Sequence, residues 1–343
     1  MKLLIITQKV DENDQLLGFF TEWLVRFAKR FEKITIVCLE KGKFSLPKNV
    51  RVISLGKDRK AGKLKQLFNF YFLLFALRKE YNAVFAHMNP IWVVLGGLFW
   101  RLMRKKIFFW YTSGGVTAKL KLAEKFADTI FTASKESFRL PSKKVVVTGH
   151  GIDTELFQPQ EYNRESHSDK LKILSVGRIA PVKNYEVLVN ASKILADNGV
   201  LFSVTIIGES VLKRDKDYES KIKNQLKELD LSGYFNFVGK VSQKNLPAYY
   251  QFHDLFVHLS KTGSVDKVLL EAMASGVAVL SSNESSRSFL PSELIFKEDD
   301  SSELAYKIKK ARSNHNTYHL REYVVANHNL DNLIEKISTF VKK

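Results

Sequence analysis

Two cations follow a short apolar run near the middle of the chain, in a pattern suited to binding a diphosphate. Residues 171–176 are typical of a buried parallel strand, Gly177 ends the run, and a turn carrying Arg178 and Lys183 leads into apolar residues at helical spacing. A helix that begins in this way directs its free N–H groups and the positive end of its dipole above the sheet. A rigid guanidinium and a mobile ammonium would complete an anion site. A tight turn with two solvated cations explains the same residues, and this stretch alone leaves both interpretations open.

Short apolar runs alternate with longer amphipathic segments along the whole chain. Such alternation predicts parallel sheets covered by helices on both faces, with ligands bound beyond the carboxyl ends of the strands. Strands are expected at residues 3–7, 34–39, 50–55, 83–86, 107–110, 130–132, 145–147, 171–176, 202–207, 235–238, 255–259, 277–280 and 294–296. Helices are expected at residues 17–31, 62–79, 90–103, 117–127, 184–197, 218–229, 245–252, 267–274 and 331–341, with another opening at 300–303.

The length of 343 residues indicates two domains rather than one core. Residues 149–170 are polar and lack periodicity, so they are the best candidate for a linker. We therefore expect an α/β protein with two doubly wound, Rossmann-like domains that face each other across a cleft. The expected domains are residues 1–165 and 166–320, followed by a C-terminal helical segment, 321–343, that packs back on the N-terminal domain.

The chain is strongly basic, with 54 Lys and Arg against 36 Asp and Glu and a formal net charge of +18. Phosphorylated substrates, an anionic membrane surface or nucleic acid would each suit this charge, but no nucleic-acid-binding motif is present, so nucleic acid ranks last. The single cysteine, Cys38, is expected in a buried strand, and one cysteine cannot form an internal disulfide. The apolar run at the start of the sequence is too short for a signal peptide. No apolar run reaches the ~20 residues of a membrane span. A cytoplasmic location is expected.

Two predicted helices combine apolar faces with basic flanks. Basic residues 57–65 lead into the apolar run 67–77, and apolar residues 91–100 lead into basic residues 101–106. One interpretation buries both helices against a sheet, with the charges marking their ends. The other is an interfacial surface that docks the domain on anionic lipid at the inner face of the cytoplasmic membrane.

Six stretches between residues 145 and 280, in consistent order, resemble a known family. They are residues 147–159, the turn Val176-Gly-Arg178 with Lys183, the strand end 206–209, the segments 237–242 and 249–254, and residues 270–279. Together they look like the donor-binding half of a GT-B glycosyltransferase, specifically the retaining family 4, the glycosyl transferases group 1. An ordered set of this kind is far more specific than any single motif.

The resemblance implies a role for each matched residue. Arg178 and Lys183 would bind the nucleotide diphosphate and neutralise the leaving group, Glu271 would hold the ribose hydroxyls, and the backbone at Val241 would contact the base. His87 would face the acceptor and the reacting sugar, although a packed strand-end histidine explains it equally well. The expected catalytic residues are His87, Arg178 and Lys183. The expected donor-binding residues are Gly177, Arg178, Lys183, Glu209, Val241, Gly263, Ser264, Asp266, Lys267, Leu270 and Glu271. The expected acceptor-binding residues are Gly18, His87 and Ser113.

The chain departs from the family pattern at three places. Gly263 stands where the family carries a second glutamate, eight positions before Glu271, so sugar contacts would come from Asp266, Lys267 or backbone N–H groups. Ser113 stands where the family has a histidine, and the early loop has only Gly18 in place of a glycine pair. Asp215 and Asp217 resemble a metal motif of another glycosyltransferase fold, but they lie in a polar stretch and are interpreted as a solvated helix start.

The implied function is a retaining, metal-independent transfer of a hexose from a nucleotide diphosphate sugar to a glycan or lipid-linked acceptor, in cell-envelope polysaccharide or glycolipid synthesis. No metal and no cofactor other than the donor sugar nucleotide is expected. The alternative is a GT-B protein that binds nucleotide sugars with weak or no turnover, as the departures at Gly263 and Ser113 suggest. An NAD-dependent oxidoreductase is disfavoured because the first strand leads into no Gly-x-Gly-x-x-Gly motif.

Overall fold

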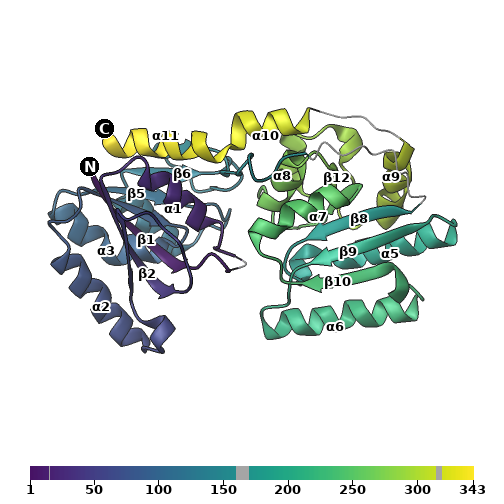
Figure 1. The fold of residues 1–343 in the computed structure, drawn as a ribbon, viewed down its shortest axis with the longest axis horizontal. Coiled ribbons are helices and arrows are strands. Elements are labelled where there is room, and N and C mark those ends of the chain that lie inside the picture. Colours follow the sequence, from purple (N-terminus) through teal and green to yellow (C-terminus); the bar gives the residue numbers. More distant parts are fainter. Residues whose placement is uncertain (15, 160–169, 314–318) are drawn as a thin grey trace. The chain divides into compact units, whose positions relative to one another are not determined.

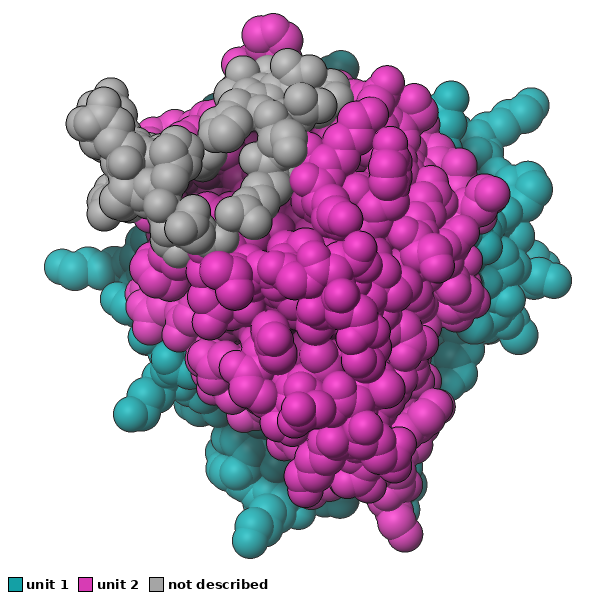
Figure 2. All heavy atoms as spheres, turned by 90° about the vertical axis from the view of Figure 1, so that its right-hand side faces the viewer, with its two compact units in different colours: residues 1–151, 328–343 teal, residues 152–327 magenta. Residues whose placement is uncertain are grey.

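A computed structural model describes residues 1–14, 16–159, 170–313 and 319–343. The chain divides into two compact units, residues 1–151 with 328–343 and residues 152–327, which are coloured separately in Figure 2. Each unit contains one parallel sheet, so the prediction of two doubly wound α/β domains is confirmed (Figure 1). No helix in the described ranges is long and apolar enough to cross a bilayer.

The first unit is built on a seven-stranded parallel sheet with the strand order β3-β2-β1-β4-β5-β6-β7. Its central strands read as apolar runs because both of their faces are covered. The strands are β1 (Lys2–Val10), β2 (Lys33–Lys41), β3 (Val50–Ser54), β4 (Ala83–His87), β5 (Lys106–Trp110), β6 (Thr129–Thr132) and β7 (Val145–Val147). Cys38 is fully buried on β2, as predicted.

Alternate residues of β1 belong to different cores. Leu3 and Ile5 pack with helices α1 (Phe20–Ala28) and α11 (Leu330–Lys342), whereas Leu4 and Ile6 pack with α2 (Lys63–Ala76), α3 (Pro90–Leu102) and α4 (Ala118–Phe126). This division follows from the two-residue period of a strand, which sends neighbouring side chains to opposite faces. Helix α11 therefore returns from the end of the sequence to complete the core of the first unit.

The second unit is built on a five-stranded parallel sheet with the strand order β10-β9-β8-β11-β12. The chain moves from β8 outward to β10 and then returns to the other side of β8, so the order reverses between β8 and β11. Ligands of open α/β sheets bind beyond the carboxyl ends of the strands at this reversal. The strands are β8 (Leu171–Val176), β9 (Phe202–Ile207), β10 (Phe235–Gly239), β11 (Leu255–His258) and β12 (Ala278–Ser281).

Helices cover both faces of the second sheet. The side chains of Leu171 and Ile173 on β8 pack with α5 (Tyr185–Asp197), α6 (Lys213–Glu228) and α9 (Ser301–Ser313). Leu174 and Val176, which point the other way, pack with α7 (Leu246–Phe252), α8 (Lys267–Ala274) and α10 (Leu320–His328).

Three local predictions about the second unit are wrong. Residues 294–296 form no strand but a short 3₁₀ turn (Ser292–Leu294) and one isolated bridge between Ile295 and Ser281. Helix α10 lies almost entirely within the C-terminal segment 321–343 that was expected to be helical, although it was not predicted as a separate helix. Helix α6 begins at Lys213, five residues earlier than expected, and Asp215 is buried rather than solvated because its carboxylate accepts a hydrogen bond from Leu212 N–H at 3.1 Å. At the start of α5 the side chain of Asn184 makes no capping hydrogen bond: its amide donates to Asp299, and Tyr218 Oη accepts from Tyr185 N–H.

The two units are divided at other residues than expected. The first break follows Gly151 rather than residue 165, and the predicted boundary itself lies outside the described residues. The return to the first unit occurs at His328 rather than at residue 321, so most of α10 belongs to the second unit. Arg321 on α10 donates to the carbonyls of Thr154, Phe157 and Ala274, which ties this helix to the second unit.

Candidate functional site

Three neighbouring strands of the second sheet end at glycines that contact one another through their backbones. Gly177 follows β8, Gly208 follows β9, and Gly239 ends β10. Gly208 N–H donates to the Gly239 carbonyl at 2.9 Å, and a Cβ added to Gly208 would lie 2.0 Å from the Gly177 carbonyl oxygen. No side chain fits in that space, so Gly208 keeps the strand ends close together and the loop of Arg178 in place.

The ammonium of Lys183 bridges the loops that follow β8 and β11, at the point where the strand order reverses. Lys183 Nζ lies 2.5 Å from Asp266 Oδ2 and 3.2 Å from Ser260 Oγ. His258, at the end of β11, places its Nε2 3.0 Å from the same carboxylate oxygen. Burial alone would raise the pKa of Asp266, but Lys183 and His258 hold the pKa of this carboxyl far below its usual range. The carboxylate is therefore ionised at neutral pH.

A second charged pair lies on the helix that follows Asp266. Lys267 and Glu271 stand four residues apart on α8, and Glu271 is buried. Burial raises the pKa of Glu271 despite the opposing influence of Lys267, and burial lowers the pKa of Lys267 to about 8 despite Glu271. Tyr250 Oη and Gln243 Nε2 each lie 3.3 Å from an oxygen of Glu271 and can donate to it. This carboxylate is held in place by neutral donors.

Arg178 projects from the other side of the glycine turn. Its guanidinium lies 3.9 Å from the carboxylate of Asp215, which is only 1% exposed at the start of α6. About a third of the Arg178 side chain remains exposed. A buried anion beside a partly exposed guanidinium orients the guanidinium without covering it. The sequence did not reveal this role because Asp215 lies in a run of charged residues that looks solvated.

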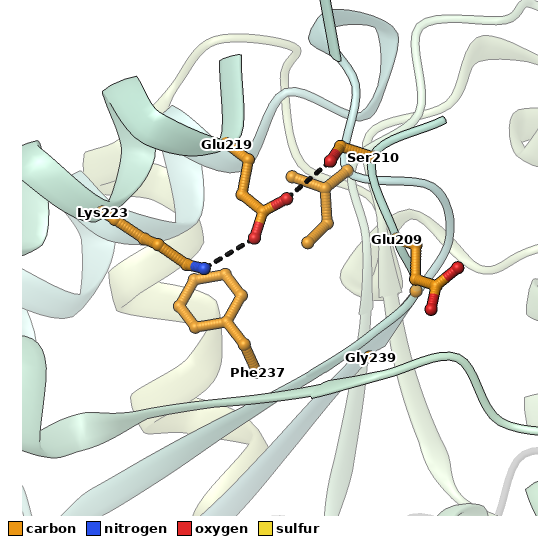
Figure 3. A pocket seen from close by; sticks show the side chains of 8 residues that line it. Glu209, Ser210, Glu219, Lys223, Phe237 and Gly239 are labelled. Carbon is orange, nitrogen blue, oxygen red and sulfur yellow. Dashed lines mark hydrogen bonds and ion pairs between the residues drawn. The ribbon is translucent and has the colours of Figure 1, made fainter. Parts of the chain in front are cut away.

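A hollow of about 300 Å³ lies beyond the ends of β9 and β10, next to the glycine contacts. Its walls include the Phe237 ring and an ion pair between Lys223 and Glu219 at 2.6 Å, and Glu219 also accepts a hydrogen bond from Ser210 (Figure 3). The lining residues are Ile179, Gly208, Glu209, Ser210, Glu219, Lys223, Phe237 and Gly239. Glu209 is the only lining residue that the sequence had assigned to the site.

The remaining predicted donor residues lie in the loop before α8, on α8 itself, or after β10. Gly263 takes the left-handed conformation with φ of 64°, in the loop between β11 and α8. Ser264 is buried in the same loop, and its carbonyl lies 3.3 Å from Thr262 Oγ1. Leu270 is fully buried in the core between α8 and the sheet, so its side chain is a packing residue. Val241 follows β10 and is half-buried, but it does not line the hollow.

The three predicted residues of the first unit differ in accessibility. His87 ends β4 and is 1% exposed, with its ring stacked on Phe20 at 3.8 Å and its Nδ1 3.2 Å from Thr7 Oγ1. This geometry favours the packed strand-end role that the sequence had left open. Gly18 is also buried, and a Cβ there would lie 2.4 Å from the Asp14 carbonyl oxygen. Ser113 is exposed in the loop after β5.

Four predicted residues of the second unit therefore lie together at the start of α8 or next to it: Lys183, Asp266, Lys267 and Glu271. Lys183 contacts Asp266 directly, and Lys267 and Glu271 follow on the same helix. Arg178 stands apart from these contacts and is paired with Asp215. Among the described residues, no group of three or more His, Cys, Asp or Glu side chains is arranged to hold a metal ion. The arrangement offers cations and a helix N-terminus to an anionic ligand.

Comparison with known proteins places these features in a family. The model of the family described as "Glycosyl transferases group 1" matches residues 158–329, which is half of the chain and includes all five strands of the second sheet. The chain is similar to the amylovoran biosynthesis glycosyltransferase AmsK of Erwinia amylovora, with 32% identity over 151 residues. It is also similar to mannosylfructose-phosphate synthase of Agrobacterium fabrum, with 27% identity over 149 residues.

These alignments cover 42% and 41% of this chain, and the chain spans about a third of each curated relative, 35% and 33% respectively. Among solved structures, the chain is similar to HepE of Anabaena in complex with UDP, with a TM-score of 0.80, 16% identity and coverage of 100% of both chains. At that identity the likeness shows a shared fold.

Proposed function

Because the chain belongs to the glycosyl transferases group 1 family, we propose that it transfers a hexose from a nucleotide diphosphate sugar to a glycan or lipid-linked acceptor. The bond between the anomeric carbon and the β-phosphate oxygen breaks, and a bond to the acceptor hydroxyl oxygen forms on the same face of that carbon. The hydroxyl releases its proton, and the nucleoside diphosphate leaves. The proposed setting is cell-envelope polysaccharide or glycolipid synthesis at the inner face of the cytoplasmic membrane.

The observation that carries this proposal is the placement of Lys183 at the strand-order reversal, beside the first turn of α8. Negative charge grows on the departing diphosphate as the glycosidic bond breaks, and fixed cations and helix N–H groups lower the free energy of that transition state. We propose that Lys183 and Arg178, rather than a metal ion, neutralise the leaving group. Lys267 adds a third cation at the same helix end.

The nucleoside would lie next to these cations. Glu271 is a fixed acceptor for the ribose hydroxyls, because Tyr250 and Gln243 hold its carboxylate. The hollow beside Phe237 offers an aromatic wall for a base, with Glu209 at its edge. HepE was solved in complex with UDP and with UDP-glucose, so uridine nucleotides are the first to test here.

One observation favours a second candidate, a protein that binds nucleotide sugars with weak or no turnover. Asp266 already neutralises Lys183, and the neighbouring Gly263 offers no side chain to a donor sugar. A diphosphate would have to share Lys183 with this carboxylate. If it cannot, donor binding persists through Arg178 and Glu271 while the leaving group receives less stabilisation.

A thermal-shift series with UDP, GDP and ADP tests the donor site. We expect at least one nucleotide to raise the melting temperature of the wild-type protein, because a ligand that binds only the folded state stabilises it. The increment should be largely lost in Lys183→Ala and kept in Lys193→Ala, which removes an exposed lysine that pairs with Asp197 on α5. If no nucleotide changes the melting temperature, the donor site is misplaced.

Turnover then separates the two candidates. The purified protein is incubated with the sugar derivative of the nucleotide that binds best, and release of the nucleoside diphosphate is measured. Release by hydrolysis or transfer supports the enzyme. Tight binding without release, at several protein concentrations and with acceptor glycans present, supports the binding protein.

A further inference from the structure

Helix α2 exposes most of its apolar surface, contrary to the interpretation that buries it against the sheet. Only Phe70 and Leu74 are buried within the helix. Leu64, Phe68, Phe72 and Phe75 are 85%, 70%, 61% and 59% exposed. They recur at intervals of three and four residues, so they form one stripe along the helix. The helix has 14 residues and is about 21 Å long. An exposed apolar stripe of this length is unusual on a protein surface that faces only water.

Helix α3 extends this surface. The Phe70 ring lies 5.6 Å from the Trp92 ring, and Tyr71 Oη donates to the Leu95 carbonyl at 3.1 Å, so the two helices lie side by side (Figure 1). Leu98 and Leu102 on α3 are 62% and 77% exposed. We call Leu64, Phe68, Tyr71, Phe72, Phe75, Leu98 and Leu102 the apolar face.

Most charged residues around the apolar face are positive, although the exposed Asp58 stands among them. Neither α2 nor α3 contains an acidic residue. Exposed cations precede α2, stand on its first turn, follow α2, and lie at the end of α3 and after it. They are Lys57, Arg59, Lys60, Lys63, Lys65, Lys79, Arg101, Arg104 and Lys106. Two of them are also in ion pairs, Lys57 with Glu40 and Arg101 with Asp128. An apolar stripe between cations matches the boundary of a bilayer, where phenyl rings enter the acyl region and ammonium groups remain at anionic headgroups.

We propose that the apolar face docks the first unit on a bilayer surface that contains anionic lipid. The phenyl rings of Phe68 and Phe72 enter the interface, and the surrounding cations contact the headgroups. This proposal concerns a different surface from the donor site and does not depend on which nucleotide that site binds. It gives the proposed lipid-linked acceptor a route to the protein that needs no membrane-spanning helix.

Co-sedimentation with vesicles tests the proposal. The full chain should bind vesicles of phosphatidylcholine with phosphatidylglycerol, and it should bind phosphatidylcholine alone at least tenfold more weakly. Raising the salt from about 0.1 M to about 1 M should weaken binding, because the Debye length falls from ~10 Å to ~3 Å. Each of Lys63→Gln and Lys65→Gln should lower the partition coefficient roughly fivefold.

Variants locate the surface. Phe68→Ser with Phe72→Ser should lower binding more than tenfold, whereas Tyr306→Ser, which removes a 63% exposed ring of α9, should leave it unchanged. Because Cys38 is fully buried, a cysteine introduced by Phe68→Cys can carry an environment-sensitive fluorophore. Its emission should shift to the blue with anionic vesicles, and the same label at Tyr306→Cys should not shift.

Two results would overturn the proposal. One is equal binding of wild type and the double serine variant to anionic vesicles, which would place the membrane contact elsewhere. The other is concentration-dependent self-association of the wild type without vesicles that the double serine variant abolishes, which would make the apolar face an interface between copies of this chain. Nucleotide-induced thermal shifts in the same variants show that the donor site is folded in either case.

Discussion

Asp266 sets the charge that the candidate site presents to a ligand. Its carboxylate contacts both Lys183 and His258, and burial lowers the pKa of His258 despite the neighbouring carboxylate. At neutral pH the imidazole is therefore uncharged, and Asp266 cancels the charge of Lys183. A diphosphate must compete with a fixed anion for the same ammonium, so Asp266 sets the affinity of the site.

Asp266→Asn should raise the affinity for a nucleoside diphosphate, by about tenfold, because the ammonium of Lys183 no longer has a competing anion. Affinity for the diphosphate sugar should rise less, since we propose that the same carboxylate accepts hydrogen bonds from sugar hydroxyls. Isothermal titration of both ligands measures the two changes. Asp197→Asn is the matched control, because it removes an exposed carboxylate that pairs with Lys193 on α5, away from these contacts. Weaker binding of the free diphosphate by the Asp266 variant would contradict the competition.

Lys267 makes the site sensitive to alkaline pH, because its folded-state pKa is about 8 against an ordinary value of 10.5. Affinity for a nucleoside diphosphate should fall as pH rises through 8 and this cation is lost, by up to tenfold per pH unit. Stability should change in the opposite direction. The unfolded chain holds the lysine proton more tightly, so the contribution of this residue to the free energy of unfolding is lowest below pH 8 and grows toward pH 10.5.

Nucleotide binding and urea unfolding, each measured between pH 7 and 10, test how the affinity and the free energy of unfolding depend on pH. In Lys267→Gln the binding slope should be absent and the rise in stability should be smaller. Identical slopes in the variant and the wild type would assign the titration to another group.

The chemistry of single residues could be predicted only in part. Lys183 and Glu271 could be assigned to the candidate site because they stand at fixed places in an ordered set of motifs. The contacts of Asp215 and the Phe237 wall of the hollow were missed, because one lies in a run of charged residues and the other in an ordinary strand. A side chain that acts through burial or partners far along the chain leaves no local pattern.

At the scale of elements, the ends of β8, β9 and β10 are positioned by the contact between Gly208 and Gly177. Gly208→Ala should lower the free energy of unfolding of the second unit by about 2–4 kcal/mol, because a Cβ 2.0 Å from a carbonyl oxygen forces the strand ends apart. Urea unfolding followed by far-UV circular dichroism measures this loss. Gly233→Ala is the control, since nothing lies within 4 Å of its added Cβ. Equal stability of the two variants would show that the strand ends yield without cost.

Elements were predictable where periodicity and burial agree. Strands β8 and β9 and helix α8 begin and end where the apolar pattern predicted. The prediction of a strand at residues 294–296 was wrong, because three apolar residues pack equally well in a turn. The sequence did not decide whether α2 is buried or exposed. An apolar helix has the same residue pattern whether it packs on a sheet or faces a membrane or another partner.

At the scale of the whole molecule, each of the four hydrophobic clusters in the described residues belongs to a single unit. The clusters of the first unit include Leu333 and Ile337 of α11. The hydrophobic core of the first unit is therefore completed only by residues near the end of the sequence. The exact boundaries could not be predicted from composition: the break after Gly151 lies near one end of the predicted linker, residues 149–170, and the break before His328 carries no change in residue type. They follow from which core buries each helix.

Separate cores predict separate unfolding transitions in calorimetry. Ile337→Ala should lower the transition of the first unit and Leu188→Ala that of the second, each by about 2–5 kcal/mol, because both side chains are fully buried. A nucleoside diphosphate at about 100 times its Kd should stabilise only the transition that Leu188→Ala lowers, by ~2.7 kcal/mol, since the proposed donor residues all lie in the second unit. A ligand shift confined to the transition that Ile337→Ala lowers would move the donor site to the first unit. One transition that both variants lower together would show that the two cores unfold as one cooperative structure.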